Sequence, residues 1–130
     1  MFITLLIAII IVTIAVGLCS LIILFRNPRR ISYGSKGSIT GTCGDTMELV
    51  LTFHNGRVHD GSYWTDGCPH SFMCLYSAVK LARGKKPEDI LDLNYKAIVK
   101  SVGGLPEDHL HCATLAIQTL HSAVDEYMSN

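Results

Sequence analysis

The sequence predicts an α+β domain, a small three-stranded antiparallel sheet packed against helices, preceded by one transmembrane helix. Three observations carry this prediction. Residues 2–25 form an apolar run without a charged side chain. Apolar and polar residues then alternate on either side of Asn55-Gly56, and after Cys68 the apolar residues recur at helical spacing. Strands followed by helices in this order indicate helices gathered on one face of a sheet.

The apolar run at residues 2–25 is long enough to cross a membrane. At a rise of about 1.5 Å per residue such a helix is about 36 Å long, against a hydrocarbon core of about 30 Å. A secretory signal peptide is the alternative, but no Lys or Arg precedes the run. Arg26, Arg29 and Arg30 follow it directly. We therefore expect a transmembrane helix at residues 1–25, and the positive-inside rule predicts that the domain after this anchor faces the cytoplasm.

Composition divides the rest of the chain into a linker and one domain. We expect residues 26–38 to form a basic, Gly- and Ser-containing linker and residues 39–130 to form the domain. The 130-residue chain has 11 Lys and Arg against 11 Asp and Glu, a formal net charge of +0. This balance gives no general case for nucleic-acid binding, which needs a basic surface.

Period and turn chemistry predict the sheet. Residues 47–54 alternate between apolar and polar side chains, as a half-buried strand does. Asn55-Gly56 predicts a tight hairpin, because both central positions of a type I′ turn need positive φ. Residues 57–65 form the returning strand, with Gly61 as a candidate bulge, and residues 33–40 a third strand.

The second half of the chain predicts helices. One begins after Cys68 and ends near Gly84, and a short one spans residues 87–93. Asn94 is placed to cap the next helix, which runs to Val102. The last helix carries a packing stripe of Leu115, Ala116, Leu120, Ala123, Val124 and Tyr127.

Three cysteines in distant segments are the candidate chemical groups. Cys43, Cys68 and Cys112 lie at loop or helix starts, and Asp45 and His111 lie within two residues of the first and the third. Thiolates joined by one carboxylate or imidazole suit an iron–sulfur cluster or zinc better than magnesium or calcium. Because stable clusters are commonly held by four thiolates, we expect a harder fourth ligand to hold a cluster loosely enough for handover.

Local context separates these cysteines from the others. Pro69 favours the first helical position, which makes Cys68 the N-cap, where free amides and the helix dipole favour a thiolate. Cys74 lies among core residues of the same helix and is expected to be a small buried hydrophobe. Of the remaining histidines, His70 is the one closest to a site cysteine in sequence.

Two other classes of site use the same residues. Three cysteines with Asp45 or His111 are also a sound tetrahedral zinc set, which indicates a zinc-binding structural or interaction module. A thiol enzyme with Cys112 as nucleophile and His111 as base is disfavoured, because adjacent residues on a helix point about 100° apart.

Four runs in this chain resemble the iron–sulfur cluster assembly scaffolds of the IscU/NifU type. They are Thr-Gly-Thr-Cys-Gly-Asp-Thr-Met at residues 40–47, Thr-Asp-Gly-Cys at 65–68, Arg-Gly-Lys at 83–85, and Gly-Gly-Leu-Pro-Glu-Asp-His-Leu-His-Cys-Ala at 103–113. The resemblance covers roughly residues 39–128, and the run at residues 2–25 lies outside it. The Pro-Glu version of the last run is most similar to the short NifU-like scaffolds.

The resemblance implies a role for each site residue. The family's three cluster-binding cysteines are matched by Cys43, Cys68 and Cys112. Asp45 matches the aspartate that keeps the cluster labile, and His111 matches the histidine before the third cysteine. Cys112 also matches the acceptor of persulfide sulfur from a cysteine desulfurase. The family function implied is assembly of a transient [2Fe–2S]-type cluster from iron and sulfide and its transfer to recipient apoproteins, without enzymatic turnover.

One run departs from the family pattern. Many members carry Leu-Pro-Pro-Val-Lys before the histidine, a sequence read by a dedicated heat-shock chaperone. Here residues 105–109 are Leu-Pro-Glu-Asp-His. The resemblance therefore does not imply release through that chaperone, and His109 is expected to be an ion-pairing or pH-sensitive substitute for the lysine.

Overall fold

The computed structural model describes the backbone of residues 1–26 and 34–130 and the side chains of residues 1–23 and 34–130. The chain divides into two compact units, Met1–Ile31 and Ser32–Asn130. The first contains helix α1, Phe2–Arg26. Of the described helices, α1 is the one long and apolar enough to cross a membrane, with a mean hydropathy of 3.1 over Phe2–Ile23. The basic side chains that predict its orientation lie outside the described residues.

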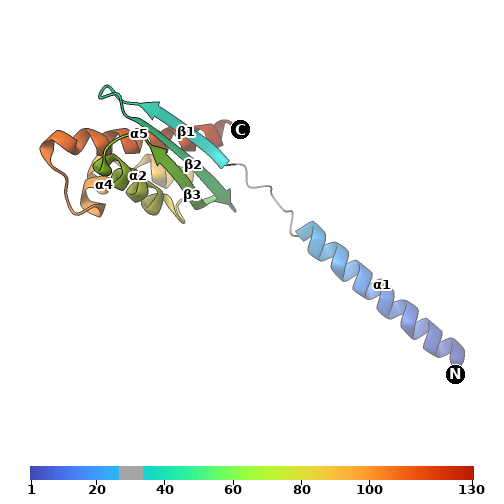
Figure 1. Cartoon of the computed structure of the whole chain (residues 1–130). Helices are drawn as coiled ribbons and strands as arrows, with labels where there is room; N and C mark the ends of the chain where they lie inside the picture. The colour runs from blue at the N-terminus through green and yellow to red at the C-terminus, as the bar shows by residue number, and fades with distance from the viewer. Residues whose placement is uncertain (27–33) are drawn as a thin grey trace. The chain divides into compact units, whose positions relative to one another are not determined.

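The second unit contains the predicted three-stranded antiparallel sheet, in the order β1-β2-β3 (Figure 1). Its strands are β1 Gly34–Thr40, β2 Thr46–His54 and β3 Arg57–Thr65. The β2–β3 hairpin has its predicted turn, because Asn55 has a φ of 51° and Gly56 a φ of 73°. The α+β fold class expected from the sequence is confirmed.

Four α-helices and one 3₁₀ turn follow the sheet. They are α2 Pro69–Ala82, α3 Pro87–Leu91, α4 Tyr95–Ser101, η1 Glu107–His109 and α5 Leu110–Ser129. Cys68 is the N-cap of α2 with a proline at the start of the helix, as the sequence predicts. The side chain of Asn94 accepts a hydrogen bond from the backbone N–H of Lys96 at 3.0 Å and caps α4.

One face of the sheet makes the core. Met47, Leu49 and Leu51 alternate along β2 and are each 0% exposed. Helices α2 and α5 cover this face, α2 against β3 and α5 against β1. At Gly37 a Cβ atom would lie 2.2 Å from the carbonyl oxygen of Thr119, so α5 can approach β1 only over a glycine.

Two sequence expectations differ from the structure. The third strand predicted at residues 33–40 is present as β1, but it begins at Gly34, inside the segment 26–38 that composition assigned to the linker, because its small residues are ordered by pairing with β2 and by α5. The irregularity of the hairpin lies at His59, where Thr52 pairs with Asp60 and the next residue pairs with Val58. Gly61 is instead a close-approach position, where a Cβ would meet Val79 of α2 at 3.1 Å.

Candidate metal centre

The turn between β1 and β2 carries the first two predicted site residues. The N–H of Gly41 donates to the carbonyl of Asp45 at 2.8 Å, and the N–H of Gly44 donates to the carbonyl of Gly41 at 3.0 Å. Gly44 has a φ of 91°, which a glycine adopts without steric cost. This tight turn brings the ligand atoms of Cys43, Asp45 and His111 within 4.8 Å of one another.

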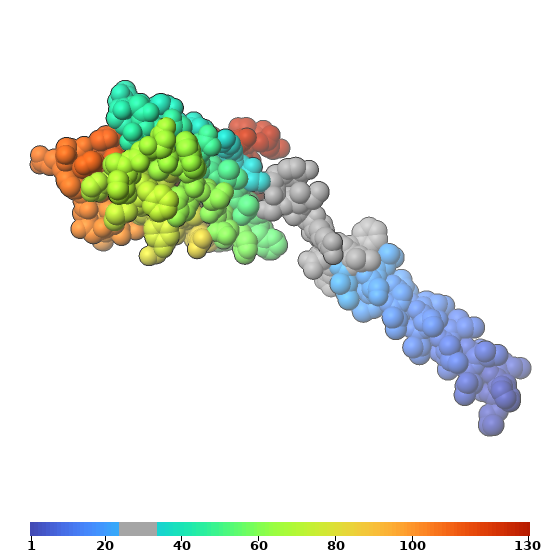
Figure 2. Space-filling model, in the orientation of Figure 1, coloured from blue at the N-terminus to red at the C-terminus, as the bar shows by residue number. Residues whose placement is uncertain are grey.

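The turn meets the beginnings of α2 and α5 at one end of the unit. In the space-filling view the turquoise turn after β1 and the orange segment that leads into α5 are neighbours at that end (Figure 2). Cys68 caps α2 and is partly exposed, whereas Cys112, in the first turn of α5, is 1% exposed. The Sγ of Cys112 lies 3.6 Å from the Nε2 of His111.

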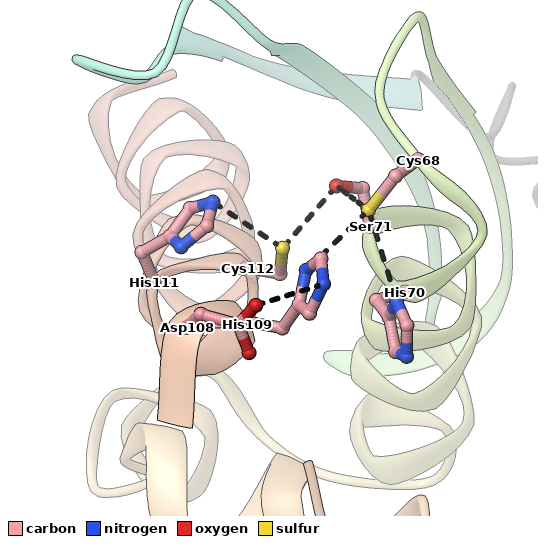
Figure 3. A network of polar contacts seen from close by, with 7 residues as sticks. All are labelled: Cys68, His70, Ser71, Asp108, His109, His111 and Cys112. Carbon is pink, nitrogen blue, oxygen red and sulfur yellow. Dashed lines mark hydrogen bonds and ion pairs between the residues drawn. The ribbon is translucent and has the colours of Figure 1, made fainter. Parts of the chain in front are cut away.

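A buried serine connects the three segments. Ser71, in the first turn of α2, is 0% exposed. Its Oγ lies 3.2 Å from Asp45 Oδ2, 3.4 Å from Cys112 Sγ and 3.6 Å from Cys68 Sγ. Figure 3 shows this hydroxyl between the two thiols. Asp45, Cys68 and Cys112 therefore meet at Ser71, while Cys43 and His111 adjoin Asp45, so a turn and two helix starts contribute all five predicted site residues to one region.

A glycine keeps this junction close. A Cβ atom at Gly67 would lie 2.6 Å from Asp45 Oδ2 and 2.7 Å from Ser71 Oγ. Any larger residue before Cys68 would push the β1–β2 turn away from α2. In the 65–68 run, Gly67 is therefore needed because no side chain fits there, and Cys68 is needed for its thiol.

The two inner thiols have opposite electrostatic environments. Partial burial of Cys68 opposes ionisation, but hydrogen bonds from the backbone N–H and hydroxyl of Ser71 and from His70 outweigh it and lower its pKa to about 7. Burial raises the pKa of the Cys112 thiol, and the negative charges of Cys68 and Asp45 raise it further against the Ser71 hydrogen bond. In the metal-free protein near neutral pH, Cys68 is the partly ionised thiol and Cys112 the protonated one.

Cys74 is separate from this chemistry. It is 0% exposed within the core, and burial raises the pKa of its thiol to about 12. The expectation that Cys74 is a buried hydrophobe is confirmed.

Sequence reasoning did not include Ser71 in the site, and it gave His70 and His109 minor roles. His109 Nδ1 lies 3.8 Å from Cys68 Sγ, and His70 Nδ1 lies 4.0 Å from the same sulfur. The signal for Ser71 was its place three residues after an N-cap, on the first turn that faces the site. No sequence signal joins His70 to His109, because their contact depends on how α2 and η1 pack.

Comparison with known proteins agrees with this geometry. Residues 22–130 match the family model described as the NifU-like N-terminal domain. The chain belongs to this family. The relatives of this NifU-like chain include the iron–sulfur cluster assembly scaffold protein IscU 1 of Archaeoglobus fulgidus, 31% identical over 79% of this chain and 71% of the relative. Another is the scaffold protein IscU of Aquifex aeolicus, 30% identical over 80% of this chain and 71% of the relative.

More distant likenesses concern one domain or the fold alone. The nitrogen fixation protein NifU of a Nostoc species is 26% identical over 75% of the NifU-like chain, which spans 33% of that longer protein. The crystal structure of a hypothetical protein superposes with a TM-score of 0.56 at 21% identity, covering 71% of this chain and 82% of that one. The resemblance to the IscU/NifU scaffolds predicted from the motifs is confirmed.

Proposed function

We propose that this NifU-like chain is a scaffold on which an iron–sulfur cluster is assembled and from which it is transferred to recipient apoproteins. The observation that carries the proposal is the gathering of Asp45, Cys68 and Cys112 around Ser71, with Cys43 next to Asp45, in a chain whose relatives are named as cluster assembly scaffolds. The cluster is cargo of this site and not a resident cofactor. The same relatives favour this function over the zinc-binding module that the motifs alone leave open.

The donor set fits a cluster that leaves again. Three thiolates bind iron well and hard cations such as magnesium or calcium poorly. The carboxylate of Asp45 is a weaker ligand than a thiolate for the iron of a cluster. Asp45 is half-buried and shares the Ser71 hydroxyl with Cys112. We infer a [2Fe–2S]-type cluster held by Cys43, Cys68, Cys112 and Asp45, with His111 as an alternative ligand to Asp45.

Sulfur enters at Cys112 in this scheme. The Cys112 thiol gives up its proton and its sulfur attacks the outer sulfur of a desulfurase persulfide; the new S–S bond forms on Cys112, the S–S bond of the desulfurase breaks, and its leaving thiolate takes up the proton. Cys112 is 1% exposed, so the segment with His109 and His111 has to move aside for this encounter. The chain itself then stores and hands over atoms and performs no turnover of a substrate.

Helix α1 adds a location to this scheme. We propose that it anchors the scaffold in a membrane, with the second unit in the cytoplasm, because Phe2–Ile23 is long and apolar enough to span. Fractionation of cells tests this point. The protein should remain with membranes after a high-salt wash and be released by detergent, and its recovery in soluble fractions would exclude the anchor.

Anaerobic reconstitution tests the scaffold function. The full chain in detergent micelles, mixed with Fe²⁺, cysteine and a cysteine desulfurase, should gain visible thiolate-to-iron absorption and acid-labile sulfide. Cys43→Ala, Cys68→Ala and Cys112→Ala should each abolish the absorption. The matched control is Cys19→Ala, which removes an exposed cysteine of α1 outside the site and should leave it intact.

The fluorescence of Trp64, the chain's single tryptophan, reports whether each variant keeps the fold of the second unit. Equal absorption in the wild type and in all three folded site variants would contradict the ligand assignment. Stoichiometric zinc without acid-labile sulfide in anaerobically purified protein would support the zinc-binding module instead.

A further inference from the structure

The metal centre contains a second group of donors, of which the cluster scheme uses Cys68 but neither histidine. The ligand atoms of Cys68, His70 and His109 all lie within 4.8 Å of one another, as those of Cys43, Asp45 and His111 do. The two groups have no residue in common. Figure 3 shows His70 and His109 together below the Cys68 sulfur, with the Ser71 hydroxyl on the other side of that sulfur. Both histidines are half-buried.

The second group has nearly the spacing of a tetrahedral metal site. With metal–sulfur and metal–nitrogen bonds of about 2.3 and about 2.0 Å, a tetrahedral ion separates the S and N ligands by about 3.6 Å. The observed separations from Cys68 Sγ are 3.8 Å to His109 Nδ1 and 4.0 Å to His70 Nδ1. To place all three atoms on one ion, the two imidazole rings have to turn until both Nδ1 lone pairs point at a common position.

The orientation of the rings is more specific than packing requires. The rings of His70 and His109 stack at 4.1 Å with an interplanar angle of 22°. A half-turn of either ring about its Cβ–Cγ bond would keep the stack and direct a carbon atom at the sulfur, yet both rings direct the same nitrogen, Nδ1, at one sulfur atom. Convergence of two imidazole nitrogens and a thiol on one point is the arrangement that a metal ion needs.

The contact of the second ring nitrogen of His109 also fits a metal ligand. Its second nitrogen, Nε2, faces the carboxylate of Asp108 at 3.7 Å. A histidine that binds metal through one ring nitrogen typically gives its other N–H to a carboxylate or carbonyl, which fixes the tautomer. A slight approach of Asp108 would let it accept a hydrogen bond from Nε2–H, the tautomer that leaves the Nδ1 lone pair directed toward Cys68.

We propose that Cys68, His70 and His109 bind a single Fe²⁺ ion as a mononuclear site, distinct from the cluster ligands except for the shared Cys68. The choice of iron among divalent metals rests on the proposed function, because iron is the material from which the scaffold builds. One thiolate and two imidazoles form a borderline set that accepts Fe²⁺, Co²⁺ or Zn²⁺ and leaves one position open. When the ion binds, the Cys68 thiol releases its proton to solvent. A bound ion is then already attached to one cluster ligand.

Cobalt binding tests this site. Metal-free full chain in detergent micelles is titrated with Co²⁺ without oxygen, and the thiolate-to-cobalt and d–d absorption bands give the affinity. His70→Gln and His109→Gln should each weaken Co²⁺ binding by about tenfold or more, because each removes a ligand. His59→Gln is the matched control, since His59 is an exposed histidine of the β2–β3 hairpin. The double variant Cys43→Ser, Asp45→Asn should keep the affinity, and competition by Fe²⁺ should displace the cobalt.

A second measurement does not depend on variants. In the wild-type Co²⁺ complex, paramagnetic proton NMR should show two exchangeable, strongly shifted imidazole N–H signals, one from each histidine. The proposal is overturned by Co²⁺ affinity that is unchanged in folded His70→Gln and His109→Gln proteins, or by fewer than two such signals.

This result is separable from the test of the scaffold function. If the wild type assembles a cluster and the two histidine substitutions leave the Co²⁺ affinity unchanged, the mononuclear site is refuted and the scaffold function is supported. If cobalt binding needs both histidines and no cluster forms in the wild type, the mononuclear site stands and the scaffold fails.

Discussion

The hydroxyl of Ser71 should control the ionisation of Cys68. Ser71 donates to Cys68 through both its backbone N–H and its Oγ, and these bonds lower the Cys68 pKa to about 7 against the effect of burial. Ser71→Ala removes the Oγ and leaves the backbone N–H in place. The substitution therefore isolates one hydrogen bond at the centre of the site, with little change of volume.

The expected shift follows from the strength of that bond. A hydrogen bond to a charged group contributes about 1.5 to about 3 kcal/mol, and one pKa unit corresponds to about 1.4 kcal/mol. The Ser71 hydroxyl has one proton, which it shares among Cys68, Cys112 and Asp45. We therefore expect the lower end of the range, a rise of the Cys68 pKa by about one unit. Near neutral pH the ionised fraction of Cys68 falls from about one half to about one tenth.

The pH dependence of stability has the same origin. The Cys68 pKa in the folded protein, about 7, lies below its ordinary value of 9.0. Ionisation of Cys68 therefore favours the folded state, and this contribution is complete above the ordinary value and is lost as the pH falls through the folded value. Ser71→Ala should raise the lower limit of the pH range over which this contribution changes, because it raises the Cys68 pKa of the folded protein.

Alkylation kinetics measure the shift. Iodoacetamide reacts with thiolates, so its rate at Cys68 in metal-free protein, resolved by peptide mass spectrometry between about pH 5.5 and about pH 9.5, gives the pKa. Cys74 serves as an unreactive internal reference, because burial raises its pKa to about 12. Ser77→Ala is the matched control. Ser77 is also buried in α2, at 2% exposure, and among the described residues its hydroxyl has no hydrogen-bond partner. A Cys68 midpoint that is the same or lower in Ser71→Ala than in Ser77→Ala would refute the reasoning.

Two further substitutions test the fold that positions the site, both followed by urea unfolding of the second unit with Trp64 fluorescence. Gly37→Ala should reduce the free energy of unfolding by about 3 kcal/mol, because its Cβ would lie 2.2 Å from the backbone oxygen of Thr119 and α5 has to shift. An unfolding midpoint equal to that of the wild type would show that α5 does not pack closely on β1 at this position. Asn94→Ala should cost about 1 kcal/mol through loss of the α4 cap, with Asn94→Ser retaining most of it, and equal losses in both variants would argue against capping.

Local signals in the sequence determine much of this fold. The Asn55-Gly56 turn, the cap at Asn94 and the position of Pro69 after Cys68 are each set by residues close in the chain, and the structure has all three. The predicted alternation of apolar and polar residues along β2 is also present, with every second side chain buried. The sequence placed β1 both in a predicted strand at residues 33–40 and in the linker at residues 26–38, and only pairing with its neighbours decides that this Gly- and Ser-rich segment is a strand.

The sequence by itself determined which atoms are available for chemistry: the three cysteines, Asp45 and His111, in runs that identify the family. The tertiary structure alone decided that the Ser71 hydroxyl lies among three of these groups, and that His109 reaches Cys68 from 41 residues away. The physical reason is the range of the interactions. Turns and caps depend on a few neighbouring residues, whereas a donor set depends on how a turn and two helix starts pack over one sheet.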